Sequence, residues 1–99
     1  MTDMYVKIHR SSKHFMVAVC DSELIGRHLV NENCEITVHA SFYKGEEADE
    51  ETVMDLLCGA TTANIIGKKA IECAVQCGIV DPASVIYFGD VPHALYFTI

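Results

Sequence analysis

The sequence is short of positive charge, of proline and of long apolar runs. It has 7 lysine and arginine residues against 14 acidic ones, which gives a net charge of −7. A field of that sign repels phosphate backbones, so general electrostatic binding to nucleic acid is disfavoured. Only 2 prolines occur. No apolar run approaches the roughly 20 residues that span a membrane. We therefore expect neither a linker-rich chain nor a membrane protein.

The signatures of several common sites are also missing. The 5 cysteines are an odd number and form no Cys-x-x-Cys pair, and no His-x-x-x-His pair occurs. Since no export signal is recognisable, we expect a cytoplasmic protein with reduced thiols. A phosphate-binding loop is ruled out because Thr62 stands where its first glycine is required and Lys69 where its hydroxyl is required. The sequence predicts no metal site and no cofactor.

Apolar residues make up 51% of the 99 residues, which is rich for so short a chain. A chain of this size has room for one core, so we predict a single domain over residues 1–99. Part of the apolar surplus is expected to be covered by a partner, and a homodimer is the simplest one.

Hydrophobic alternation predicts five strands. A hairpin is expected first, and Asp21 or Ser22 then caps a short helical turn. The third predicted strand has one solvent-exposed face. A tight loop at Gly89–Pro92 is expected to join the last two strands. The predicted strands are Tyr5–His9, His14–Cys20, Glu35–Phe42, Val85–Phe88 and His93–Ile99.

Two main helices are predicted between these strands. Asp49 is the expected N-cap of the first, which ends at Gly59, and the acidic block at 46–55 suits the positive end of its dipole. The second runs from Thr61 or Thr62 to Cys77. Small residues spaced alternately three and four apart predict one narrow face on it: Ala60, Ala63, Gly67, Ala70 and Ala74. This order favours an α+β domain, with both helices on one face of a mostly antiparallel or mixed sheet.

Cys20 and Asp21 form the first candidate site. Cys20 ends a predicted strand just before a short helical turn, and a thiol at a helix N-terminus can have a lowered pKa. His93 or His14 could serve as its base. The alternative is a buried thiol that only fills space.

His93 and Asn64 form the second candidate site. His93 follows Pro92 in a Gly-x-x-Pro-His-Ala segment that starts at Gly89. A histidine held this way can bind a ligand or shuttle a proton, or it can lock the loop through backbone hydrogen bonds. Asn64 can likewise line a pocket or bond to a loop. The ligand-binding candidates are Asn64, Gly89, Pro92 and His93.

Four segments, taken in order, resemble one known family. They are Val19 to Gly26, Ser41 to Gly45, the Ala-x-x-Ala-Asn-x-x-Gly segment of residues 60–67, and Ile86 to Ala94. This set is similar to the archaeal family catalogued as domain of unknown function 424. The resemblance implies an archaeal cytosolic protein with a one-domain α/β fold. It implies no activity and assigns no catalytic residue. Cys34, Cys58, Cys73 and Cys77 depart from the family's usual appearance.

Two functions remain open from the sequence. The first is a non-enzymatic binding module whose partner is a protein or a structured RNA of the translation apparatus, with Lys7, Arg10 and Lys13 as the RNA contacts. The second is a small enzyme or small-ligand binder built from four side chains: Cys20, Asp21, Asn64 and His93. Convergence of these side chains in one concave pocket favours the second function.

Overall fold

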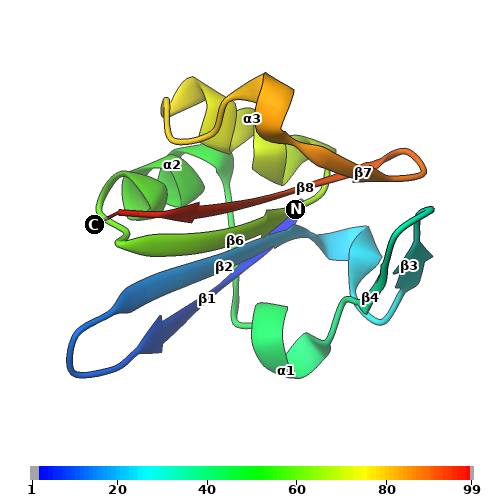
Figure 1. The fold of residues 1–99 in the computed structure, drawn as a ribbon. Coiled ribbons are helices and arrows are strands. Elements are labelled where there is room, and N and C mark those ends of the chain that lie inside the picture. The colour runs from blue at the N-terminus through cyan, green and yellow to red at the C-terminus, as the bar shows by residue number, and fades with distance from the viewer. Residues whose placement is uncertain (1–2, 99) are drawn as a thin grey trace.

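The fold is built on a six-stranded sheet in the order β5-β1-β2-β6-β8-β7 (Figure 1). The structure is a computed structural model that describes residues 3–98. Within that range, β2 and β6 are the one parallel pair of this sheet, and its other neighbours run antiparallel. The strands are β1 (Met4–Arg10), β2 (Phe15–Asp21), β5 (Glu46–Ala48), β6 (Thr62–Ile66), β7 (Ile86–Phe88) and β8 (Val91–Phe97).

Two helices, α2 (Glu50–Cys58) and α3 (Lys68–Gln76), cover one face of this sheet, which we call the helix face (Figure 1). The largest core cluster lies between them and the strands. Its fully buried members include Val17, Val19, Val53, Leu57 and Ile65. Alternate residues of β2 and β6 supply this core, because successive side chains of a strand point to opposite faces.

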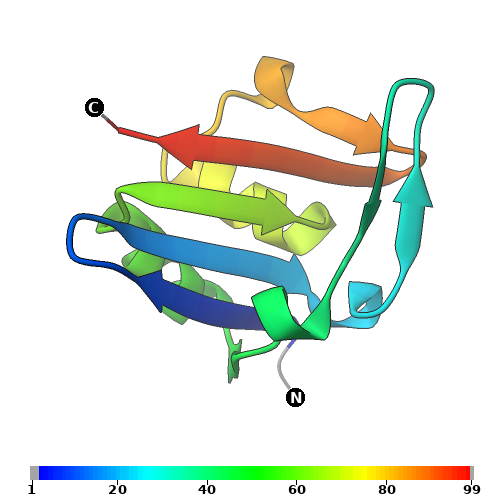
Figure 2. The ribbon, with the colours of Figure 1, turned by 60° about the horizontal axis from the view of Figure 1, so that its bottom comes forward.

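The opposite face, which we call the open face, is covered only in part (Figure 2). A short helix and a two-stranded hairpin lie over part of it. The amide of Asn31, at the tip of this hairpin, donates to the carbonyl of Tyr87 in β7 at 3.3 Å. A second core cluster lies beneath, with Ala18, Cys20 and Ile66 on the sheet side. The covering elements are η1 (Ser22–Leu24), β3 (His28–Val30), β4 (Glu35–Thr37) and α1 (Ala40–Tyr43); η2 (Pro82–Ser84) precedes β7.

The predicted α+β class is confirmed. The sheet is mixed and mostly antiparallel, and α2 and α3 share one of its faces as expected. The predicted first hairpin is β1 and β2. Asp49 caps α2 by accepting the N–H of Thr52 at 2.9 Å, and Gly59 is the C-cap. The sheet has six strands rather than five, because β5 and β6 join it and the predicted strand Glu35–Phe42 does not.

The prediction of one strand from Glu35 to Phe42 is wrong. The strand β4 ends at Thr37, and Ala40 to Tyr43 form α1. The buried Val38 bonds through its main chain to Gly26 and Arg27 rather than to a strand partner. The chain then turns at His39, whose carbonyl accepts from Phe42 and Tyr43. Of the alternating apolar residues, Val38 is buried, Ile36 and Phe42 are half-buried, and Ala40 is exposed.

The prediction of one helix from Thr61 or Thr62 to Cys77 is also wrong. Residues 62–66 form β6, and α3 begins only after Gly67. Gly67 has φ 112° and ψ 154°, which a helix does not contain. The small residues from Ala60 to Ala74 are all buried, but a strand, a turn and a helix bury them separately.

The end of the chain follows the prediction more closely. Its last two strands pair around a turn at Gly89 and Asp90, and Gly89 has a φ of 64°. Val91 and Pro92 belong to β8 rather than to the predicted loop, and His93 lies in the strand as predicted. Ile99, the last residue of the predicted strand, lies outside the described residues. In the described part of the chain, no helix is long and apolar enough to cross a membrane.

Candidate functional site

The floor of the open face is made by alternate residues of the four longest strands (Figure 2). On β6 the residues facing this side are Thr62, Asn64 and Ile66, because Ala63 and Ile65 belong to the core under the helices. The β6–β8 register places Ile66 opposite His93. His93, Leu95 and Phe97 therefore lie on this same face.

Three polar side chains meet on that floor, and we call them the Tyr43–Asn64–His93 cluster. The hydroxyl of Tyr43 donates to Oδ1 of Asn64 at 2.6 Å. Nε2 of His93 lies 3.1 Å from the same oxygen. Since Oδ1 accepts, Nε2 is the protonated nitrogen, and Nδ1 of His93 is left as an acceptor. Two of the sequence candidates, Asn64 and His93, are thus in direct contact.

Burial keeps the members of this cluster neutral. It raises the pKa of Tyr43 to about 12, with a smaller contribution from Cys20, so the phenol stays a donor near pH 7. Burial also lowers the pKa of His93, which favours the neutral imidazole. The ring of Phe88 packs edge-on against His93 with 6.1 Å between centroids. The cluster therefore presents fixed hydrogen-bonding groups without a net charge.

Cys20 lies in the core beneath α1 rather than in an accessible position. Its exposed fraction is 0%, and it packs in the same cluster as Tyr43 and Phe88. Burial raises the pKa of the Cys20 thiol to about 12, and the neighbouring Asp21 carboxylate adds to the rise. The thiol is therefore protonated near neutral pH and shielded, which argues against a role as nucleophile.

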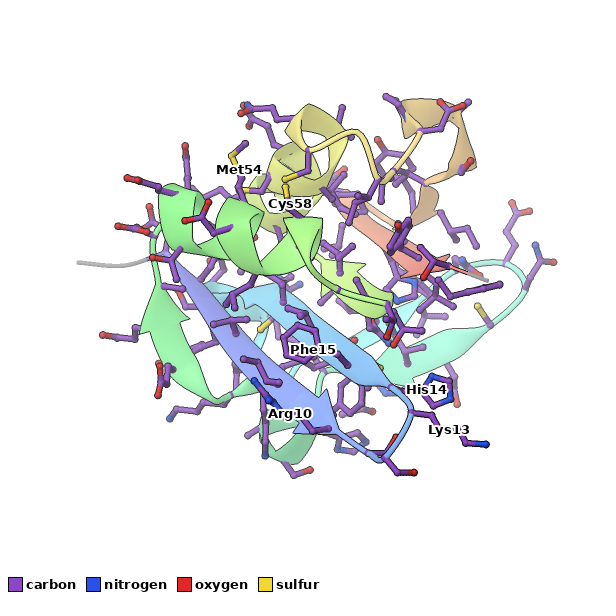
Figure 3. The ribbon with its side chains drawn as sticks, turned by 90° about the vertical axis from the view of Figure 1, so that its left-hand side faces the viewer. Arg10, Lys13, His14, Phe15, Met54 and Cys58 are labelled. Atoms are coloured by element: carbon purple, nitrogen blue, oxygen red, sulfur yellow. The ribbon has the colours of Figure 1, made fainter. Side chains whose placement is uncertain are left out.

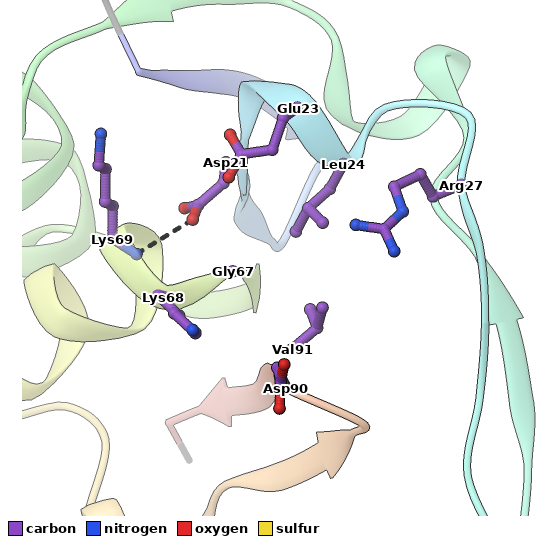
Figure 4. A pocket seen from close by; sticks show the side chains of 9 residues that line it. All are labelled: Asp21, Glu23, Leu24, Arg27, Gly67, Lys68, Lys69, Asp90 and Val91. Atoms are coloured by element: carbon purple, nitrogen blue, oxygen red, sulfur yellow. Dashed lines mark hydrogen bonds between the residues drawn. The ribbon is translucent and has the colours of Figure 1, made fainter.

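Asp21 points to the other side of the sheet. Its carboxylate accepts the N–H of Lys69 at 3.2 Å (Figure 4). It also accepts the N–H of Ala70 at 2.9 Å. These are free donors of the first turn of α3, so Asp21 caps that helix. Burial raises the pKa of Asp21, although the two N–H groups oppose the rise. The four candidates therefore do not converge on one pocket.

A depression of about 270 Å³ lies beside this cap (Figure 4). Its charged lining is balanced between acidic and basic side chains, among them Glu23, Asp90, Arg27 and Lys68. An anion at the start of α3 would compete with the Asp21 carboxylate for the same donors. This depression is consequently a poor phosphate site.

The remaining sequence candidates have structural positions. Gly89 forms the exposed turn between β7 and β8. Pro92 is buried, and its carbonyl accepts the N–H of Gly67 at 2.9 Å. Sequence reasoning missed Tyr43 as a site residue, because Glu35–Phe42 was read as a strand. Its position in the Ser41 to Gly45 segment, one of the four that carry the family resemblance, was the signal that could have found it.

Basic side chains gather at the turn between β1 and β2 (Figure 3). Arg10, Lys13 and His14 lie there, and the guanidinium of Arg10 is 5.0 Å from the ring centre of Phe15. A depression of about 350 Å³ leads from this turn onto the open face, where Met16 and Thr62 line it. Nearby, His9 stacks on Phe42 with 4.7 Å between ring centroids.

Comparison with known proteins places the chain in a family. The model of the family described as "Protein of unknown function (DUF424)" matches residues 9–99. The chain belongs to the DUF424 family. A solved structure described as an uncharacterized conserved protein from Methanopyrus kandleri aligns with a TM-score of 0.80. That alignment covers 93% of this chain and 88% of the other at 21% identity, so it supports the fold alone. None of the curated proteins matches the chain.

The DUF424 fold brings together no evident metal site in this chain. Across residues 3–98, no three histidine, cysteine or acidic side chains are grouped in a way that could hold a metal ion. The open face itself carries neutral hydrogen-bonding groups and apolar side chains, with basic side chains at the turn beside it.

Proposed function

We propose that this DUF424 protein is a cytosolic binding module that holds single-stranded RNA on the open face of its sheet. The observation that carries the proposal is the placement of Phe97. Phe97 is 71% exposed, and its side chain lies on the same face as the Tyr43–Asn64–His93 cluster. An exposed ring on a sheet offers an unpaired base a surface for stacking, as in several modules that bind single strands.

The polar cluster lies on the same face as Phe97, beyond Leu95, and supplies groups that can contact the edge of a base. Oδ1 of Asn64 already accepts from Tyr43 and His93. Its Nδ2 amide has no protein partner among the described residues, and it remains available as a donor. Nδ1 of His93 is available as an acceptor. A donor and an acceptor on two side chains that contact each other can bind the edge of an unpaired base.

The net charge of −7 disfavours RNA binding in general, but the acidic side chains are concentrated away from the open face. Much of the acidic surplus lies in β5 and α2, at one edge of the sheet and on its helix face. On the open face, Lys7 donates to the carbonyl of Ser41, and Lys44 lies 5.6 Å from the ring centre of Tyr5. Together with Lys13 in the turn between β1 and β2, these side chains give the phosphates of a bound RNA cationic contacts. Arg10 does not join them, because it lies on the helix face with its guanidinium over the ring of Phe15.

Fluorescence anisotropy with a labelled RNA of about ten nucleotides tests this proposal. Wild-type protein is expected to bind at low salt and to lose affinity as salt rises, because phosphate contacts release counterions. Phe97→Ala is expected to weaken binding about tenfold or more, since stacking contributes about 1–3 kcal/mol per base. No binding by the wild type, or unchanged binding by Phe97→Ala, contradicts the proposal.

Tyr87 provides a matched control. It is also an exposed aromatic residue on an edge of the sheet, at 57%, but it pairs with Pro92 and faces the other side. Tyr87→Ala is expected to bind RNA as the wild type does. A loss equal to that of Phe97→Ala would point to a general effect of removing an aromatic side chain.

A further inference from the structure

Among residues 3–98, no strand pairs with the outer edge of β8 over its second half. β7 pairs with Val91 to His93 only, whereas β8 continues to Phe97. On its inner side, β8 stays paired with β6 as far as Phe97. The open edge therefore covers the residues from Ala94 to Phe97, and it runs along the rim of the open face.

The hydrogen bonds on the inner side show which groups point outward. Thr98 donates to the carbonyl of Thr61, and the carbonyl of Pro92 accepts from Gly67. Even-numbered residues of β8 thus direct their main-chain groups toward β6, and odd-numbered ones direct theirs away. The N–H and C=O of Leu95 and Phe97 face the open edge, and in the described part of the chain they have no hydrogen-bond partner.

We propose that a second copy of this chain pairs with that edge, antiparallel, around a twofold axis at Tyr96. In this register Leu95 lies opposite Phe97 of the partner subunit, and the symmetric pair repeats the contact. Each pair exchanges both N–H···O bonds, so all the outward groups of Leu95 and Phe97 are satisfied. The two side chains, exposed at 63% and 71%, then form cross-strand apolar pairs.

The chemistry of the edge favours a second copy as the occupant. An antiparallel pair about a twofold axis needs a self-complementary strand, and this one provides a donor and an acceptor at both residues. The segment Ala94–Thr98 carries no charge, so the net charge of −7 is not concentrated at the contact. It also has no lysine or proline, the residues that usually protect an open edge. The pairing joins two sheets and leaves both open faces uncovered, so it does not depend on RNA binding.

Sedimentation velocity tests the pairing. An interface this small predicts a dissociation constant on the order of 100 µM, so runs span about 10 µM to about 1 mM. The wild type is expected to shift from monomer to dimer across that range. Leu95→Lys is expected to stay a monomer, because it places an ammonium group at the contact. A wild type that remains monomeric at every concentration overturns the proposal.

Two further variants keep the result interpretable. Ile8→Lys adds the same charge at an exposed apolar residue of β1, away from β8, and is expected to dimerise as the wild type does. Leu95→Pro removes only an N–H that faces outward, so the pairing with β6 is kept while the contact between copies is lost. Dimers that persist in Leu95→Pro would show that the copies associate elsewhere and would contradict this register.

Discussion

Replacing Gly67 with alanine is expected to lower the free energy of unfolding by about 4 kcal/mol. Gly67 has φ 112° and ψ 154°, a region that is almost restricted to glycine. A Cβ at this position would also overlap the carboxyl group of Asp21, which is itself held by the first turn of α3. Backbone strain and steric overlap therefore add. Urea denaturation followed by circular dichroism measures the loss.

Gly78 is the control for the backbone part of this effect. It has a φ of 80°, but a Cβ added there meets no atom within 4 Å. Gly78→Ala is expected to cost only about 1–2 kcal/mol, the cost of the left-handed conformation. Equal losses at the two glycines would contradict the packing of Asp21 against Gly67.

Replacing Asp21 with alanine is expected to cost about 2–3 kcal/mol, measured by the same denaturation. The change leaves the N–H groups of Lys69 and Ala70 without their acceptor, and the N–H of Ala70 is buried. Asp21→Asn is expected to cost less, because its single amide oxygen can still accept from one of the two. A neutral effect of Asp21→Ala would show that the carboxylate does not hold the start of α3.

The pH dependence of the free energy of unfolding tests whether burial raises the pKa of Asp21. Burial raises the pKa of Asp21 in the folded protein above its ordinary 3.8, so the folded state binds this proton more tightly than the unfolded chain does. Stability contributed by this group therefore rises as pH falls from above the folded pKa toward 3.8. Asp21→Asn lacks that contribution, so the stability gap between wild type and Asp21→Asn is expected to widen on acidification. A gap that narrows would contradict the raised pKa.

The sequence predicted best those elements whose signals are local. The Asp49 cap depends on one side chain and the N–H three residues later, and the β1–β2 hairpin depends on two alternating runs around a polar turn. Both features need only a few consecutive residues. The α+β class followed from the order of such elements, although two of the predicted elements were wrong.

The two wrong elements depended on contacts distant in the sequence. Residues 62–66 form a strand because β2 and β8 lie on either side of them, and the pairing with β2 joins residues more than forty positions apart. Their small side chains fit a helix equally well on local grounds. Glu35–Phe42 alternates as a strand does, but the strand β4 ends at Thr37 and α1 begins at Ala40. Val38 and Phe42 pack in the cluster that contains Cys20 and Tyr43.

The candidate site was predicted only in part, for the same reason. Asn64 and His93 do meet, since β6 and β8 are neighbours. Cys20 and Asp21 are adjacent in the chain, but strand alternation sends them to opposite sides of the sheet. Tyr43 comes from α1, which the sequence pattern did not predict. Which residues share a face could be settled only once the strand register was known.

Chemical-shift mapping of a bound RNA tests the central claim most directly. The 15N-labelled protein is titrated with a single-stranded RNA of about ten nucleotides while its amide signals are followed. We expect shifts for residues of β6, β8 and the β1–β2 turn, with those at Asn64, His93 and Phe97 among the largest. Signals of α2 and α3 are expected to stay in place. Shifts confined to the helices, or no shifts at all, would contradict an RNA-binding open face.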